Sequence, residues 1–253
     1  MNQIIVTEKL YITPELKRKK KIYKFYFILS VFIVLILTSF YIYAEYDRNK
    51  SAEVSQQLLD DMNKTLEGTT EDTTIAQDDV LLVVLNGTTE ETKQEEQQSS
   101  VTTANEKAEW KTSAAGYKYK IIATVEVPKI SLKYTVVQGQ SGSIEETESL
   151  LKSSPVKYHG YDPNEVGNFC IVGHNYRNSK FFSKVPNLTV GDTVKLTDLT
   201  GRTINYEVYD KHTVDPSDTK DTTQLTGGRK ELTLITCTDD SKLRVIVRCK
   251  EVK

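Results

Sequence analysis

The sequence lacks the features that define several common classes of protein. Its 253 residues include only three cysteines, six prolines and one tryptophan. An odd count of three cysteines cannot form a complete disulfide scaffold, and no Cys-x-x-Cys or His-x-x-x-His spacing of the kind that binds zinc occurs. Residues 116–253 contain no Gly-rich phosphate-binding loop, and their 20 basic and 17 acidic residues form no basic patch. We therefore expect no zinc centre, no nucleotide site and no nucleic-acid partner.

Residues 25–44 lack charge, glycine and proline altogether. An apolar helix of this length is about 30 Å long, the thickness of a bilayer's hydrocarbon core. Residues 1–24 carry seven basic and two acidic side chains, whereas Glu45 and Asp47 follow the apolar run. The positive-inside rule then predicts a cytoplasmic tail over residues 1–24, a single transmembrane anchor over residues 25–44 and an extracellular remainder. A cleaved signal peptide and a buried core helix are the alternatives, but no small-x-small cleavage site and no polar face accompany the run.

Residues 45–115 contain no proline, two glycines, and 16 acidic against six basic side chains. A polar, highly charged segment buries too little apolar surface to offset the entropy of an unfolded chain. We predict a flexible, acidic, extracellular stalk over residues 45–115. Val80–Leu85 is an apolar exception within it, and is interpreted as an added strand or a short docking segment.

The remaining residues, 116–253, have the pattern of a mainly β domain. Short apolar or alternating runs bounded by turn residues predict strands. Ser143 and Glu146 have capping-box spacing before Leu150 and Leu151, which predicts a short helix over Ile144–Leu151. About seven short strands with little helix indicate a closed or nearly closed β-barrel. The predicted strands are Lys118–Val127, Leu132–Val137, Asn168–Val172, Thr193–Leu196, Ile204–Tyr209, Glu231–Thr236 and Leu243–Cys249.

Three side chains at strand ends form a candidate catalytic group. Cys237 ends the run ELTLIT, His174 follows the run FCIV, and Arg244 begins the strand after Cys237. A cysteine nucleophile needs an imidazole to act as its base and then to protonate a leaving amine, and a guanidinium can hold a developing oxyanion. The alternative is a hydrogen-bonded histidine, an inert core thiol and a surface ion-pair partner.

The other cysteines and histidines have simpler interpretations. Cys170 and Cys249 lie in apolar runs and are expected to be small core residues, with a disulfide between them as an open alternative. His159 and His212 lie in polar surroundings and are expected at exposed loops or strand edges.

These residues resemble the motifs of the sortase family. Thr233–Cys237 (TLITC) resembles the family's TLxTC signature, Gly173-His174-Asn175 its histidine motif, and Arg244 the arginine that opens its final strand. The order His, Cys, Arg also agrees. The resemblance extends from about Tyr117 to Val252, and so covers the predicted β domain.

The resemblance implies an eight-stranded sortase β-barrel over residues 116–253 and a cysteine transpeptidase of a Gram-positive cell surface. Cys237 would attack a carbonyl in an LPxTG-like sorting signal and form a thioacyl-enzyme, with His174 as general acid and base. Arg244 would position the substrate, helped by the backbone near Thr236. The amine of a peptidoglycan precursor or a pilin would then resolve the intermediate.

The resemblance also gives expectations about subclass and cofactors. The short interval between His174 and Cys237 argues against class B, and the absence of an aromatic lid motif argues against class C, which leaves an A-, D- or E-like enzyme. We expect no organic cofactor. Six acidic residues are candidates for a calcium site or, alternatively, for solvated surface charge: Glu145, Glu146, Glu148, Asp215, Asp218 and Asp221.

Two other functions fit the same residues. A hydrolytic Cys/His peptidase would use the same thioacyl chemistry with water as the acceptor. A non-catalytic, membrane-tethered β-domain would bind wall or partner proteins and would not need Cys237.

Overall fold

The computed structural model describes residues 14–71, 104–106 and 108–252, and the chain divides into two units, residues 1–50 and 51–253. The elements in chain order are α1 (Pro14–Glu71), β1 (Lys111–Thr112), β2 (Lys118–Val127), η2 (Pro128–Ile130), β3 (Leu132–Gly139), α3 (Ile144–Leu151), β4 (Val156–His159), β5 (Gly167–Val172), η3 (Phe182–Asn187), β6 (Thr193–Asp198), β7 (Thr203–Val214), η4 (Lys220–Thr222), β8 (Lys230–Cys237) and β9 (Arg244–Glu251).

The first unit consists, in its described part, of the N-terminal portion of α1. Pro14 suits the first turn of a helix, where a backbone N–H has no intrahelical acceptor, and Glu15 lies near the positive end of the helix dipole. The apolar side chains of residues 25–44 are exposed, for example Phe25 at 64% and Leu37 at 62%. Within the described residues, α1 is the one helix long and apolar enough to cross a membrane.

Residues 51–71 continue as helix, which differs from the flexible stalk predicted over residues 45–115. Leu58 and Met62 are 4% and 1% exposed, and both belong to a cluster with Ile121 and Leu150 of the β domain. The physical reason is an apolar stripe at helical spacing, in which Leu58 and Met62 recur with Val54 and Leu66 every four residues. Residues 72–103, including Val80–Leu85, lie outside the described residues.

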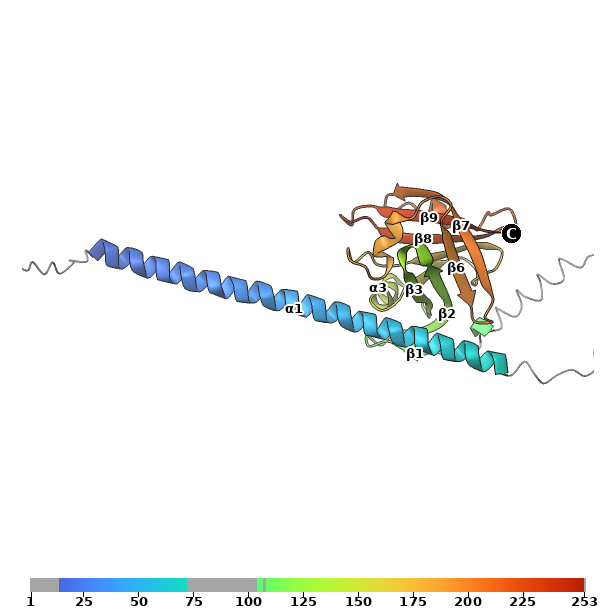
Figure 1. The fold of residues 1–253 in the computed structure, drawn as a ribbon, viewed down its shortest axis with the longest axis horizontal. Helices are drawn as coiled ribbons and strands as arrows, with labels where there is room; N and C mark the ends of the chain where they lie inside the picture. The colour runs from blue at the N-terminus through green and yellow to red at the C-terminus, as the bar shows by residue number, and fades with distance from the viewer. Residues whose placement is uncertain (1–13, 72–103, 107, 253) are drawn as a thin grey trace, which may run out of the picture. The chain divides into compact units, whose positions relative to one another are not determined.

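Eight strands form the closed barrel predicted from the sequence. Their order is β2-β3-β4-β5-β8-β9-β7-β6, and β6 pairs with β2 to close the sheet (Figure 1). The short strand β1 adds a ninth strand beside the start of β2. Most neighbours are antiparallel, but β5 and β8 run parallel over six residue pairs, from Gly167 with Lys230 to Val172 with Ile235. This parallel pair determines the position of the candidate site.

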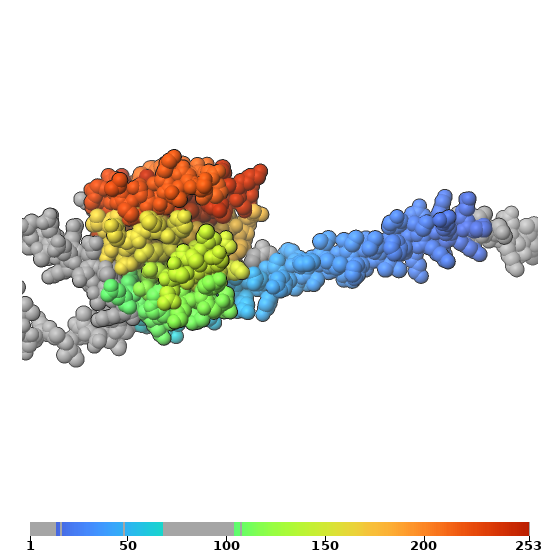
Figure 2. Space-filling model, turned by 180° about the vertical axis from the view of Figure 1, so that it is seen from behind, coloured from blue at the N-terminus to red at the C-terminus, as the bar shows by residue number. Residues whose placement is uncertain are grey.

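Side chains of β8 and β9 alternate between the barrel interior and its outer surface. Leu232, Leu234 and Val247 belong to the interior core, whereas Ile235 and Ile246 form a separate cluster with Cys170. The same alternation places Cys237 on the face of Ile235, and Arg244 on the face of Ile246. In the space-filling view of Figure 2, the last part of the chain (orange to red) and the first part of the β domain (green) form opposite sides, with residues near 160 (yellow) between them.

The helix α3 has the bounds predicted from its cap. The Ser143 hydroxyl accepts the Glu146 N–H at 3.2 Å, as in a capping box. The Glu146 carboxylate, however, accepts the backbone N–H groups of Gln140, Ser141 and Gly142. A Cβ atom at Gly139 would lie 2.2 Å from Glu146 Oε2, so this packing requires glycine there. Glu146 therefore fixes the turn before α3.

The strands β1 and β4 were not predicted. Each is short, at two and four residues, and β4 pairs with β3 through Val137 and Val156 alone. Such short runs show too few alternations to distinguish them from loop.

Candidate active site

Cys237 and Arg244 lie directly opposite each other on neighbouring strands. They are the last register pair of the antiparallel strands β8 and β9. Opposite residues of antiparallel strands have Cβ atoms about 5 Å apart and point to the same face of the sheet. Both side chains are partly exposed, whereas the preceding residue of β8, Thr236, is 1% exposed. The thiol and the guanidinium thus share the outer face of the barrel.

His174 leaves the sheet at the same edge as Cys237, because β5 and β8 are parallel neighbours. Gly173 donates its N–H to Ile235 O at 3.0 Å, and the Thr236 hydroxyl donates to Gly173 O at 2.8 Å. A Cβ atom at Gly173 would lie 2.4 Å from the ring of Phe182, so the close packing here requires glycine. The structure therefore brings all three predicted residues to one edge, and gives Thr236 a positioning contact.

Asn175 connects the histidine loop to the cysteine turn and was not identified from the sequence as a site residue. Its Nδ2 donates to Cys237 O at 3.0 Å and to Asp239 Oδ1 at 2.9 Å. Its Oδ1 accepts the N–H of Arg177 at 2.9 Å. Its sequence signal was its place in the segment Gly173-His174-Asn175, at the start of a polar loop. This one side chain links the two segments that carry Cys237 and His174.

The environment of His174 favours the uncharged imidazole. Burial lowers the pKa of His174; the carboxylate of Glu148 acts in the opposite direction, and Lys152 lowers the pKa further. The ring packs on Tyr176 with centroids 5.2 Å apart. A neutral imidazole can accept a proton from a thiol and return it to an amine.

Arg244 and Arg248 share a face of β9 but have different partners. Arg248 pairs with Glu231 at 3.0 Å, a carboxylate only 2% exposed, and approaches Asp221 at 3.8 Å. The described contact of Arg244 is a 3.4 Å bond from Nη1 to Leu243 O. Arg248 is therefore held by structural ion pairs, whereas Arg244 remains available to a ligand.

A cavity of about 220 Å³ begins at Arg244 and extends along the outer face of the sheet. Ile235, Ile246 and Val172 line its floor, and Glu148 of α3 lines one side. The opposite side is residues 215–229, the loop between β7 and β8, which contributes Pro216 and Thr222 among others.

The loop between β7 and β8 is fastened to the barrel by Gln224 and Asp221. Gln224 exchanges bonds with the backbone N–H and carbonyl of Asn168, both at 2.9 Å. Asp221 Oδ2 lies 2.9 Å from Nε2 of His212, whose Nδ1 is 3.0 Å from Asp210. The two carboxylates raise the pKa of His212 against the opposing effect of burial. His212 is thus an anchoring residue of the loop, and not simply an exposed strand-edge histidine.

The remaining candidates occupy separate places. His159 is exposed on β4, as expected. Cys170 lies beneath the β7–β8 loop and Cys249 inside the barrel, on opposite faces of the sheet, and both are free thiols, so the disulfide alternative is not realised. The six candidate calcium ligands are not brought together: no group of three or more His, Cys, Asp or Glu side chains within the described ranges is arranged to hold a metal ion.

A sequence model of the sortase domain matches residues 125–252, half of the chain. The chain therefore belongs to the sortase family. The barrel is similar to that of sortase C1 from Streptococcus agalactiae, with a TM-score of 0.50 and 20% identity over 79% of this chain and 99% of that one.

Two further solved structures have a comparable likeness. The sortase D5 transpeptidase of Clostridium perfringens has a TM-score of 0.49 and 25% identity over 76% of this chain and 98% of that one. Sortase A from Corynebacterium diphtheriae has a TM-score of 0.48 and 21% identity over 83% and 95%. No match is found among curated proteins. Because a sortase C1 is among the similar structures, the expected exclusion of class C is not supported.

Proposed function

We propose that this sortase is a membrane-anchored transpeptidase that cleaves an LPxTG-like sorting signal and joins the new carboxyl end to an amine. The observation that carries the proposal is the meeting of Cys237, Arg244 and His174 at one edge of the barrel. The exposed apolar segment of α1 supports anchoring through residues 25–44, with the catalytic domain outside the cell. An enzyme held at the membrane meets anchored substrates at a raised effective concentration.

In the first half-reaction, the Cys237 sulfur attacks the carbonyl carbon of the scissile peptide bond while His174 accepts the thiol proton. The carbonyl oxygen becomes an oxyanion, and the Arg244 guanidinium stabilises it. The carbon–nitrogen bond then breaks as His174 returns the proton to the leaving amine. The products are a thioester on Cys237 and the released C-terminal fragment.

In the second half-reaction, an incoming amine attacks the thioester carbonyl. His174 removes a proton from the attacking nitrogen, and the carbon–sulfur bond breaks as the thiol of Cys237 is restored. A new amide bond replaces the one that was cleaved. The amine is proposed to belong to a peptidoglycan precursor or a pilin lysine.

The test uses the full chain in detergent micelles, because residues 51–71 pack on the β domain and their removal would expose Ile121 and Leu150. Wild type and Cys237→Ala are incubated with LPxTG-type peptides, with and without oligoglycine or a diaminopimelate-type amine, and the products are identified by mass spectrometry. We expect a Cys237-dependent product in which the amine is joined to the threonine. Cleavage with water as the acceptor, even with amine present, would indicate a peptidase. Folded protein without adduct or product would overturn the proposal.

A further inference from the structure

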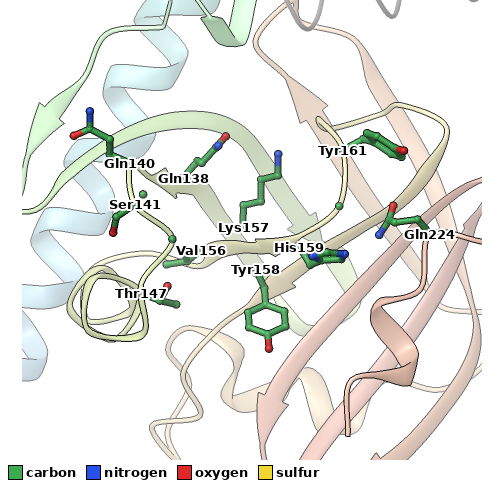
Figure 3. A pocket seen from close by; sticks show the side chains of 13 residues that line it. Gln138, Gln140, Ser141, Thr147, Val156, Lys157, Tyr158, His159, Tyr161 and Gln224 are labelled. Carbon is green, nitrogen blue, oxygen red and sulfur yellow. The ribbon is translucent and has the colours of Figure 1, made fainter. Parts of the chain in front are cut away.

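A second, larger groove adjoins the cavity beside Arg244. It has a volume of about 530 Å³ and is lined by residues of β3, β4, the turn before α3, and Gln224 (Figure 3). Tyr158 and Thr147 line both the groove and the cavity. In Figure 3 the ring of Tyr158 points away from Lys157, into the space between α3 and the β7–β8 loop. The groove and the cavity are therefore adjacent, and the half-exposed side chain of Tyr158 lies between them.

Hydrogen bonds within the protein hold both ends of this groove in place. At one end, Glu146 accepts three backbone N–H groups of the turn at residues 140–142, as described above. At the other end, Gln224 is bonded to the backbone of Asn168, and a Cβ atom at Gly160 would lie 2.1 Å from Asn168 O. Contacts within the protein thus fix the two ends of the groove, while the groove itself stays open to solvent.

The lining suits a polypeptide backbone. Gln138 and Gln140 offer amides, Tyr158 and Tyr161 offer exposed aromatic rings with hydroxyl groups, and none of the described residues that line the groove carries a carboxylate. Amides both donate and accept hydrogen bonds, as an extended peptide requires, and tyrosine supplies rigid contact area. Lys157, the lysine among the described residues that line the groove, is paired with Asp162 at 3.3 Å.

The chemistry of the reaction determines which half of the substrate reaches this groove. The acyl half stays bound through both half-reactions, whereas the leaving half must depart to admit the amine. His174 protonates the leaving nitrogen, and none of the described residues that line the cavity comes from the loop at 173–180 that carries His174. The cavity therefore holds the acyl half, and the groove beyond it receives the residues that precede the sorting motif.

The strand register gives the length of chain required. Val172 pairs with Ile235 at the level of the cavity, whereas Asn168, which holds Gln224, pairs with Glu231. Glu231 lies six positions before Cys237 on β8, or about 20 Å along the strand. An extended substrate covers this distance with about six residues, of which the four of an LPxT acyl half cover about 13 Å.

Resting on the function proposed above, we propose that the groove lined by Gln138, Gln140, Tyr158 and Tyr161 is a binding site for the polypeptide segment immediately upstream of the sorting motif.

The test measures acylation of the full chain by peptides that share one motif and differ in length. One series adds zero, two, four or six neutral polar residues (Ser, Asn, Gln) before the motif, and a second series adds them after it. We expect upstream extension by two to four residues to lower KM by about tenfold with little change in kcat, and downstream extension to have a much smaller effect. In the double variant Gln140→Ala/Tyr161→Ala, the KM values for short and long peptides should differ by no more than about twofold.

Controls separate this site from general damage and from failure of the proposed function. Val190→Ala removes an exposed apolar side chain that lines neither space, and should keep the tenfold ratio. Tyr161→Phe should keep most of it, because the ring is retained. If upstream extension did not lower KM in wild type, or still lowered it tenfold in the double variant, the groove would not be the binding site, and the proposed function would be unaffected. Peptides that fail to acylate Cys237 at any length would overturn the proposed function and, with it, the groove.

Discussion

Replacing Arg244 or Arg248 with alanine should damage the protein in two different ways. The two residues are four positions apart on one face of β9, yet only Arg248 has a buried partner. Arg244→Ala removes a group proposed to stabilise the oxyanion, and loss of one such donor lowers kcat by about 100- to 1,000-fold. Its melting temperature should change by no more than about 1 °C, because the described contact it loses is one weak bond to a neighbouring carbonyl.

The magnitude for Arg248→Ala follows from what remains around Glu231. That carboxylate keeps a bond from the Tyr209 hydroxyl at 2.9 Å and an ion pair with Arg229 at 3.0 Å. The loss is therefore one charge-assisted hydrogen bond to Glu231 and the longer ion pair with Asp221, about 2–3 kcal/mol together, and not the full penalty of an isolated buried charge. For a domain of this size, this corresponds to about 5–10 °C in melting temperature.

The assay compares both variants with wild type by thermal unfolding and by the kinetics of peptide acylation. The expected pattern is a slow, stable Arg244→Ala and a less stable Arg248→Ala that retains at least about a tenth of the wild-type kcat. If Arg248→Ala were inactive at full stability, or Arg244→Ala active, the assignment of roles would be wrong.

Three further predictions concern other parts of the structure. Asn175→Ala should lower kcat by roughly tenfold without loss of melting temperature, because it releases the Cys237 turn from the His174 loop; unchanged kcat would contradict this role. Met62→Ala should cost about 2–4 kcal/mol in packing of residues 51–71, seen as faster proteolysis within that segment, whereas the exposed Gln57→Ala should have no effect. Because the folded pKa of His212 is raised, its contribution to stability should be complete below about pH 6.5 and be lost as pH rises through the raised value. The melting temperatures of Cys237→Ala with and without His212→Gln, measured from pH 5 to 9, should therefore converge at high pH. A difference that stays constant across this range would refute the role of His212 in anchoring the β7–β8 loop.

Much of the β domain could be predicted because its signals are local. Alternation along Lys118–Val127 and the cap at Ser143 each lie within a few residues of the element they define. The candidate site residues could be selected from the sequence because Cys237 and His174 each follow an apolar run and Arg244 precedes one. The parallel pairing of β5 with β8, which brings Cys237 and His174 to one edge, is a long-range contact that no local pattern contains.

The helical segment at residues 51–71 was missed because composition averaged over residues 45–115 concealed a short periodic stripe. Val54, Leu58, Met62 and Leu66 are few among many charges, but they lie on one side of a helix. Their partners, such as Ile121, are distant in sequence, so only the folded domain shows what they pack against. The roles of Asn175 and His212 depend in the same way on contacts across loops.

The burial of two of the three thiols leaves Cys237 as the one cysteine that a reagent can reach in the folded protein. Cys170 and Cys249 are both 0% exposed, and burial raises the pKa of Cys170 to about 12, which leaves little thiolate to react. Cys237 alone is partly exposed. An alkylating reagent should therefore modify the folded chain once, at Cys237, and the unfolded chain three times, so that more than one label per chain in a native sample reports unfolded molecules.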